Sequence, residues 1–409
     1  MVRLEGVFMF ICVAGKNNIA VDILEYLRKN CRGRYELAIV CNKTETGKNG
    51  FQKSLRFWAN RYNISEYTLE EIYEKEELIF LSLEFDQLIN PERFRDARLY
   101  NIHFSLLPKY KGMYTSAIPI LNGERYVGVT LHKIDRGVDT GDIIAQRRFN
   151  VERNYTCRDL YLQYIKHGTI LVLQNIENLI DDCIYAVEQK SDDSTYYSKK
   201  YIDYSNIKID LRQTAMGIDR QIRAYSFREY QLPVVYGKRI ISTYITETKS
   251  DAKPGTVLAQ DDMGMLIATI DYNVILYIDR FEELIQACKE GDIETVKEIC
   301  QVDSHVNAVD NNGWTPLIVA TYNNRKNIVK YLLLKGANIY AKNNNGTNLL
   351  MYAKDAYIAS SDNELFVLFA KLGLSVKECD YMGKNLDDYL ALIGMSVTDI
   401  VEEEYAKYE

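Results

Sequence analysis

The chain has 409 residues, more than one ordinary domain core holds, so we expect two or three domains. Hydrophobic residues make up 47% and charged residues 26%, which excludes a disordered or fibrous protein. The net charge is −7, and residues 281–409 account for it with 12 Lys and Arg against 20 Asp and Glu. The remaining residues are near neutral, with 38 basic and 37 acidic side chains. Since nucleic-acid-binding surfaces are normally basic, no nucleic-acid partner is expected.

The eight cysteines form no CxxC pair, and most lie in apolar runs, as buried thiols do in a reducing compartment. The apolar run VFMFICVAG near the start is too short to cross a bilayer and lacks the flank of a signal peptide. We therefore expect a cytoplasmic protein with no membrane association. With four histidines and no metal-binding spacing among them, no metal site is expected.

Strand and helix patterns alternate over the first two hundred residues. Apolar runs predict strands at 7–14, 35–42 and 76–85, and helical spacing predicts helices at 19–30 and 51–62. Strand patterns at 127–134 and 143–149 and a long helix at 158–182 continue the series. This alternation predicts an α/β domain over 1–204. Its Rossmann-like, mostly parallel sheet should bind ligands beyond the carboxyl ends of the strands.

From 205 to 280 the pattern changes to a helix at 211–225 followed by short alternating runs such as VVYGKRIISTYITE and NVILYID. Gly, Pro and Asp separate these runs, which is typical of strands joined by tight turns. We predict a small β-rich accessory domain over 205–280.

The last part of the chain repeats itself with an offset of 33 residues, aligning Ala287, Ala320 and Ala353. The turn sequences DNNGWTPL, NNNGTNLL and DYMGKNLD recur around these positions, and the pattern resembles ankyrin repeats. We predict an all-α ankyrin-repeat domain over 281–409. The spacing from Gly346 to Gly383 is 37 residues, so an insertion near YIASSDN is expected to bulge out of the third repeat.

The richest polar stretch is NIHFSLLPKYKG, from Asn101 to Gly112, and GVTLHKIDRGVDTG follows from Gly128 to Gly141. Together they resemble the signature of the folate-dependent formyltransferases, NxHxSLLPxYxG followed by GxTxHxxxxxxDxG. The resemblance covers roughly residues 1–280, because the helix at 211–225 and the short strands after it are similar to the accessory domain of several family members.

The resemblance implies a catalytic trio of Asn101, His103 and Asp139. An amine that attacks a formyl amide forms a tetrahedral oxyanion and must lose a proton. An imidazole titrates near neutrality, so His103 can be the base. Asn101 lies two residues earlier, shares a side of an extended segment with His103, and can donate to the oxyanion, a contact of roughly 3 kcal/mol. The family position of Asp139 implies that it orients His103 or relays a proton to the leaving nitrogen.

The family uses 10-formyltetrahydrofolate as cosubstrate and holds its pterin largely through backbone groups of two loops. By position in this sequence, the implied folate contacts are Phe85, Gln87, Leu88, Ile89, Asp135 and Arg136. Basic and aromatic side chains suit a diphosphate and a base. On the sugar-nucleotide side we therefore expect Lys16, Asn17, Lys109, Tyr110, Arg158 and Tyr161.

Formyltransferases with this signature act on glycinamide ribonucleotide, on the initiator aminoacyl-tRNA, or on nucleotide-linked amino sugars. Residues 205–280 have 10 basic and 9 acidic side chains, which disfavours tRNA, and the ribonucleotide enzymes are generally a single catalytic domain. The resemblance to bacterial sugar N-formyltransferases, some with an ankyrin segment, implies dTDP-3-amino-3,6-dideoxy-D-glucose as substrate for lipopolysaccharide O-antigen biosynthesis. The alternative is dTDP-4-amino-4,6-dideoxyglucose, because regiochemistry depends on pocket shape.

A different hypothesis is that the ankyrin segment makes this chiefly an interaction protein with a secondary catalytic domain. Trp314 lies in the turn of the central repeat beside several tyrosines, and its ring either packs the repeats or stacks a ligand. The expected ligand of that surface is a second nucleotide sugar or a protein. A homodimer is also expected, since similar sugar enzymes commonly use the accessory domain to dimerise.

Overall fold

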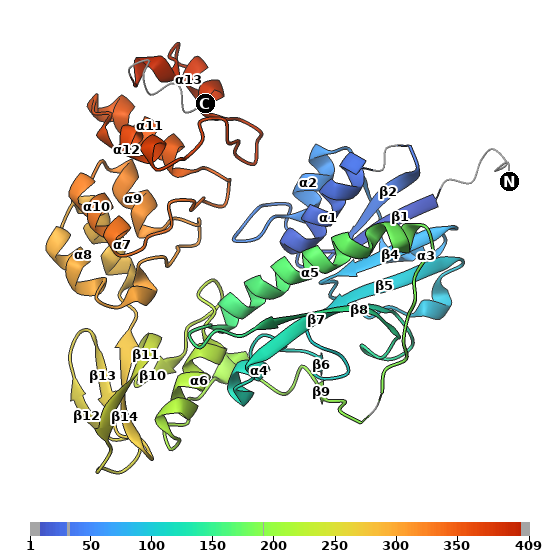
Figure 1. The fold of residues 1–409 in the computed structure, drawn as a ribbon, viewed down its shortest axis with the longest axis horizontal. Coiled ribbons are helices and arrows are strands. Elements are labelled where there is room, and N and C mark those ends of the chain that lie inside the picture. The colour runs from blue at the N-terminus through green and yellow to red at the C-terminus, as the bar shows by residue number, and fades with distance from the viewer. Residues whose placement is uncertain (1–8, 31–32, 191, 402–409) are drawn as a thin grey trace. The chain divides into compact units, whose positions relative to one another are not determined.

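The computed structural model describes residues 9–30, 33–190 and 192–401. It divides into two compact units, one of residues up to 208 with 223–227, the other of 209–222 with 228–409. A Rossmann-like sheet with helices forms the first unit, and an antiparallel sheet and paired helices form the second (Figure 1). The predicted fold class, α/β with a β-rich part and an all-α ankyrin part, is confirmed, while the domain boundaries at 204 and 280 stay predictions.

The sheet of the first unit has the strand order β3-β2-β1-β4-β5-β7-β8. Its first five strands are parallel, and the central strands β1, β2 and β4 are mostly apolar because both faces of the sheet are covered there. The last two, predicted to continue the series, are antiparallel, since no long crossover helix precedes either of them. The strands are β1 (Met9–Gly15), β2 (Tyr35–Cys41), β3 (Ser65–Glu66), β4 (Leu78–Leu83), β5 (Ala97–His103), β7 (Tyr126–Lys133) and β8 (Ile143–Asn150).

Helices cover both faces of this sheet (Figure 1). The larger core packs α1 (Asn17–Asn30), α2 (Leu55–Arg61) and α5 (Cys157–Ile180) on one face, and a smaller core packs α3 (Leu69–Tyr73) on the other. Thr156 begins α5 with a capping box that includes Asp159, which satisfies backbone donors of the first turn. The remaining elements are α4 (Ile118–Asn122) and the paired short strands β6 (Lys111–Gly112) and β9 (Tyr196–Tyr197).

The helix α6 is Ala215–Tyr225, and its part up to Ile222 belongs to the second unit. There its buried side chains Ala215, Ile218 and Ile222 pack on an antiparallel sheet. The sheet order is β10-β11-β14-β13-β12. Its strands are β10 (Val234–Val235), β11 (Lys238–Lys249), β12 (Val257–Gln260), β13 (Gly264–Ile267) and β14 (Tyr272–Ile278).

Stacked helix pairs follow in the second unit. Glycines 313, 346 and 383 have φ angles of 80°, 80° and 75°, which suit the tight turn before each pair. The expected bulge in the third repeat is wrong, because the extra residues lengthen α11 to 12 residues against 7 in α9. The helices are α7 (Phe281–Glu290), α8 (Ile293–Ile299), α9 (Pro316–Tyr322), α10 (Lys326–Leu334), α11 (Leu349–Ser360), α12 (Glu364–Lys371) and α13 (Leu386–Ala391).

A buried polar joint links the antiparallel sheet to the first helix pair. Asp279, just after β14, is fully buried and pairs with Arg228, and its other oxygen lies 3.2 Å from Arg239. The backbone N–H of Arg280 donates to Nε2 of His305 at 3.1 Å, and that nitrogen lies 3.9 Å from Asp279. Burial, the largest effect, lowers the pKa of His305 to about 4, so this side chain is neutral.

Candidate functional site

The side chains of Asn101, His103 and Asp139 meet at the carboxyl end of β5. Oδ2 of Asp139 lies 3.4 Å from Nδ1 of His103, and Oδ1 lies 3.5 Å from the side-chain nitrogen of Asn101. The side chains of His103 and Asp139 are only 9% and 12% exposed. Asn101 and His103 share a face because they are two residues apart on a strand, and the loop after β7 delivers Asp139. The structure thus brings the predicted trio together, while its catalytic role stays a prediction.

His132 fixes the orientation of Asn101. Nδ1 of His132 lies 2.7 Å from the carbonyl oxygen of Lys133, so Nδ1 is the protonated nitrogen and donates to that oxygen. Burial, and then the nearby His103, lowers the pKa of His132 to about 4, which keeps the ring neutral. Nε2 of His132 therefore accepts from the amide of Asn101 at 3.0 Å. The second N–H of the Asn101 amide points toward Asp139 as a result.

A backbone contact determines which ring nitrogen of His103 carries the hydrogen. Nε2 of His103 lies 2.8 Å from the carbonyl oxygen of Tyr110, which can only accept, so Nε2 carries the hydrogen. In the neutral ring, Nδ1 is then the nitrogen that can accept a proton. The carboxylate of Asp139 at 3.4 Å would stabilise the resulting imidazolium. This arrangement suits general base chemistry at Nδ1.

Two backbone features hold Asp139 in place. The residue has a left-handed φ of 57°, and its Oδ2 accepts from the backbone N–H of Gly112 at 2.8 Å. Asp135 closes the same loop by accepting from Gly137 at 3.0 Å and from the Thr140 hydroxyl at 2.6 Å. The loop from 134 to 142 is thus internally bonded and presents the Asp139 carboxylate to β5.

The predicted folate contacts lie on two loops that follow β4 and β7. Phe85 and Ile89 pack against the smaller core, whereas Leu88 is 84% exposed. Arg136 pairs with Glu92, so an ion pair joins the two loops. Asp135 is engaged within its loop, as described above, and Gln87 lies partly buried on the first loop. The structure brings these loops together beside β4 and β5, and their contact with folate stays a prediction.

Two predicted sugar-nucleotide contacts meet at a carboxylate that the sequence analysis did not single out. The Asn17 amide donates to Glu84 at 3.1 Å and to the hydroxyl of Tyr161 at 2.7 Å, and that hydroxyl lies 3.0 Å from Glu84. Burial raises the pKa of Glu84 to about 7, while Lys16 and the two hydrogen bonds oppose the rise. This cluster lies between the ends of β1 and β4, the switch point of the sheet, where ligands of such folds bind.

The other three predicted contacts are not part of this cluster. Tyr110 is buried, and its hydroxyl donates to Glu124 at 2.6 Å, so its backbone rather than its ring meets His103. Lys109 is exposed on the same loop. Arg158 lies in the first turn of α5, one turn before Tyr161, and its backbone N–H donates to Ser226 at 3.3 Å.

Trp314 belongs to an aromatic group of the second unit. Its ring centroid lies 5.0 Å from that of Tyr352 and 5.6 Å from that of Tyr322, both edge to face. Tyr352 is buried and accepts from Asn343 at 2.8 Å, whereas Tyr322 is 46% exposed. The ring therefore packs between repeats and also borders solvent through Tyr322.

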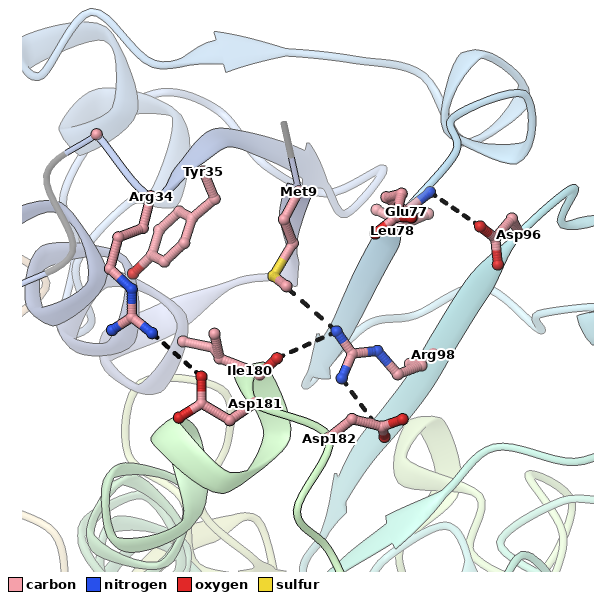
Figure 2. A pocket seen from close by; sticks show the side chains of 11 residues that line it. Met9, Arg34, Tyr35, Glu77, Leu78, Asp96, Arg98, Ile180, Asp181 and Asp182 are labelled. Carbon is pink, nitrogen blue, oxygen red and sulfur yellow. Dashed lines mark hydrogen bonds and ion pairs between the residues drawn. The ribbon is translucent and has the colours of Figure 1, made fainter. Parts of the chain in front are cut away.

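A cavity of about 760 Å³ lies at the opposite, amino-terminal edge of the sheet (Figure 2). Arg98 donates to the carbonyl oxygens of Leu179 and Ile180, the last residues of α5, at 2.8 and 3.2 Å. Arg34 pairs with Asp181 at 3.1 Å on the same rim (Figure 2). These arginines complete the carboxyl end of a helix, so the cavity is a structural feature rather than the functional site.

Three family models match the chain. The formyl transferase model matches residues 75–176, the model of the formyl transferase C-terminal domain matches 201–283, and a model of three ankyrin repeats matches 284–361. Methionyl-tRNA formyltransferase from Coxiella burnetii is 30% identical over 215 residues, which is 50% of this chain and 68% of that protein. The chain belongs to the formyl transferase family.

Other formyl transferases match over a shorter share of their length. The methionyl-tRNA formyltransferases of Clostridium tetani and Nitrosospira multiformis are each 31% identical over 43% and 44% of this chain. This chain spans 57% of the length of each.

Two solved structures resemble this chain over almost their whole length. One is WlaRD, described as a sugar 3N-formyl transferase in the presence of dTDP and 5-N-formyl-THF. It is 42% identical to this chain with a TM-score of 0.63, and the match covers 67% of this chain and 99% of the WlaRD chain. An N-formyltransferase from Helicobacter canadensis in complex with folinic acid and dTDP-3-aminofucose is 40% identical with a TM-score of 0.62, covering 66% and 100%.

No helix in the described ranges has the length and apolar character to cross a membrane. Within the same ranges, no group of three or more His, Cys, Asp and Glu side chains could hold a metal ion.

Proposed function

We propose that this chain transfers the formyl group of 10-formyltetrahydrofolate to the amine of a dTDP-linked amino-dideoxyhexose. The observation that supports this most is the meeting of Asn101, His103 and Asp139 within 3.5 Å at the carboxyl end of β5. That set supplies a neutral donor, a base and a carboxylate, which acyl transfer to an amine requires.

Each residue has a distinct role in this proposal. Nδ1 of His103 takes the proton that the amine loses when its nitrogen bonds to the formyl carbon. The Asn101 amide donates to the negative charge that develops on the formyl oxygen through the N–H that His132 leaves directed toward Asp139. Asp139 stabilises the imidazolium of His103, which then returns the proton to the folate nitrogen as the bond from that nitrogen to carbon breaks.

In this proposal the loops beside the trio hold the folate. Aromatic and aliphatic side chains, Phe85 and Ile89, lie partly buried there and offer an apolar wall to a flat ring. WlaRD and the Helicobacter canadensis enzyme are both described with a formylated folate, which supports the same cosubstrate here.

We propose dTDP-3-amino-3,6-dideoxy-D-glucose as the acceptor, formylated for lipopolysaccharide O-antigen biosynthesis. Both similar solved structures are described with 3-amino chemistry, one as a sugar 3N-formyl transferase and the other with dTDP-3-aminofucose. The Asn17, Glu84 and Tyr161 cluster lies at the switch point and would contact the sugar nucleotide. Lys109 and Arg158 would provide positive charge for the diphosphate.

Two other acceptors compete with this one. The 4-amino isomer differs only in which hexose carbon bears the nitrogen, so pocket shape decides between them. The similar methionyl-tRNA formyltransferases are named for methionyl-tRNA, but the accessory part of this chain has 10 basic against 9 acidic residues over 205–280. That surface is poorly suited to a polyanion.

A panel of acceptors tests the proposal. The purified chain and 10-formyltetrahydrofolate are mixed with dTDP-3-amino-3,6-dideoxyglucose, its 3-amino-galactose epimer, dTDP-4-amino-4,6-dideoxyglucose or initiator methionyl-tRNA. Release of tetrahydrofolate gives the rate, and mass spectrometry identifies the formylated product. The highest kcat/KM is expected for the 3-amino glucose compound. Preference for the 4-amino sugar would replace the acceptor, and formylation of the tRNA alone would refute the sugar proposal.

A second ligand on the ankyrin repeats is proposed from the Trp314 group. Tyr322 is half exposed beside the Trp314 ring, so a nucleotide base could stack there. In a variant with Trp58→Phe, Trp314 is the only tryptophan of the sequence, and titration with a dTDP-sugar should change the tryptophan emission. No change at concentrations that saturate the enzyme would exclude this ligand and favour the interaction-protein hypothesis.

We also propose that the chain forms a homodimer. The molecular mass of the purified protein in solution tests this proposal, and the mass of a single chain would contradict it.

A further inference from the structure

Gln189 lies outside both sequence motifs, yet it contacts the loop that carries Asp139. Its side-chain Nε2 donates to the carbonyl oxygen of Asp139 at 2.9 Å and to that of Gly141 at 2.7 Å. Both hydrogens of one amide group therefore bind two carbonyl groups of the same turn. A single side chain clamps the backbone on either side of Thr140.

The turn needs such a clamp because its backbone is unfavourable by itself. Asp139 has a φ of 57°, a left-handed conformation that is uncommon for residues other than glycine. At Gly141 a Cβ atom would lie 1.9 Å from the carbonyl oxygen of Lys133, so the chain passes too close for any side chain. Backbone in such conformations persists only when surrounding contacts determine it.

Gln189 is itself fixed in place through the edge of the sheet. Two residues earlier, Val187 exchanges two backbone hydrogen bonds with Ile143 at the start of β8, each 2.8 Å long. The strands β7 and β8 pair with each other, and the Asp139 loop connects them. The segment that carries Gln189 is therefore attached to the same pair of strands as that loop. The clamp is thus rigid relative to the trio.

The amide oxygen of Gln189 indicates that this side chain acts as a hydrogen-bond donor. The Oε1 atom of Gln189 is buried and, within the described residues, has no hydrogen-bond partner. Burying an unpaired acceptor is unfavourable, and an aliphatic side chain of the same size would avoid that cost. The two N–H donors distinguish glutamine from such a side chain here.

We propose that Gln189 is a positioning residue for formyl transfer, which acts by fixing the backbone of Asp139 and so the distance of its carboxylate from His103. The inference rests on the proposed function, since the reaction gives Asp139 its role. The clamp itself is a statement about geometry, and a measurement without substrate can address it separately.

Two substitutions separate the hydrogen bonds from packing. Gln189→Met keeps the length of the side chain and removes both donors, and Gln189→Glu keeps the shape but presents oxygen to two carbonyl oxygens. Gln221→Met is the matched control, because Nε2 of Gln221 also donates to two carbonyl oxygens, those of Asp210 and Gly217, in the second unit. Gln189→Asn tests rescue, since it retains the donors on a shorter stem.

The kinetic result expected is a loss of kcat of up to roughly 100-fold in Gln189→Met and Gln189→Glu, because the Asp139 carboxylate is misplaced, with the KM values for folate and sugar nucleotide within about twofold of wild type. Gln189→Asn should recover part of the loss, and Gln221→Met should keep the wild-type kcat. A wild-type kcat in Gln189→Met would overturn the proposal. So would a loss seen equally in Gln221→Met, because it would indicate a general loss of stability.

Histidine-ring NMR of the free protein tests the clamp without the reaction. The chain has four histidines, and only His103 and His132 lie within 4 Å of Asp139. In Gln189→Met the ring signals of these two should move in the same direction as in Asp139→Asn, while those of His167 and His305 stay unchanged. Unchanged signals for all four would overturn the proposal. If the signals move but wild-type protein formylates no amine, the proposed function fails and the clamp stands.

Discussion

Replacing Glu84 by glutamine should change how the stability of the first unit depends on pH. Burial raises the pKa of Glu84 from 4.5 to about 7. Between these two values the folded unit retains a proton that the unfolded chain has lost. The free energy of unfolding of the wild type therefore falls as the pH rises through this window. Glutamine does not titrate, so the variant lacks that fall.

The size of the effect follows from the shift. A pKa change of this size corresponds to roughly 3 kcal/mol, and the residual solvent contact of the partly buried Glu84 reduces the expected value to about 2 kcal/mol. Both donors of the cluster, Asn17 and Tyr161, bind the same carboxylate oxygen, and the amide oxygen of glutamine can take its place. Relative to wild type, Glu84→Gln should thus gain about 2 kcal/mol between pH 4 and pH 8.

Urea unfolding followed by tryptophan fluorescence measures this gain. The chain has two tryptophans, and in a Trp314→Phe background the remaining Trp58 reports on the first unit alone. Glu66→Gln is a control of opposite sign, because the hydrogen bond from Arg56 lowers the pKa of Glu66. Its stability relative to wild type should fall as the pH rises. A difference between Glu84→Gln and wild type that is the same at pH 4 and pH 8 would refute the reasoning.

Two further predictions concern packing. Asp279→Asn should destabilise the second unit by about 3 kcal/mol, because it leaves Arg228 partly buried without its partner. Trp314 fluorescence in urea, in a Trp58→Phe background, measures this. An effect no larger than that of Glu294→Gln, which breaks an exposed pair with Lys297 in the same unit, would contradict it. Gly15→Ala should lower the melting temperature sharply, since its Cβ would lie 1.8 Å from the carbonyl oxygen of Leu83, whereas Gly50→Ala, with open space around it, should not. Equal melting temperatures for these two variants would contradict this prediction, because they would mean that β1 and β4 can move apart at Gly15 without loss of folding free energy.

The parts of the fold that the sequence predicts best are those with a local signal. The apolar runs of β1, β2 and β4 and the repeated turns around Gly313 and Gly346 depend on composition and spacing within a few residues. The direction of β7 and β8 depends instead on what connects them to β5, which periodicity does not report. Likewise, the insertion in the third repeat was expected to bulge, but a stretch without Gly or Pro extended α11.

The same distinction applies to the site. Asn101 and His103 share a strand, and the spacing of two residues places them on one face. Asp139 is brought to them by a loop whose path depends on Gln189, fifty residues later, and no local pattern marks that residue. Glu84 had one local signal, an acidic residue directly after a continuous apolar run. Tyr110 matches the motif, but its side-chain hydroxyl donates to Glu124, and only its backbone carbonyl oxygen contacts His103.

The most direct measurement is the turnover of His103→Asn with 10-formyltetrahydrofolate and dTDP-3-amino-3,6-dideoxyglucose. Asparagine cannot accept the proton at the position of Nδ1, so kcat should fall by at least 100-fold while folate binding persists. The matched control is His167→Asn on α5, whose ring accepts from Arg147 at 2.9 Å away from the trio, and it should retain the wild-type kcat. Retained turnover in His103→Asn would contradict the assignment of the base and, with it, of the trio as the catalytic site.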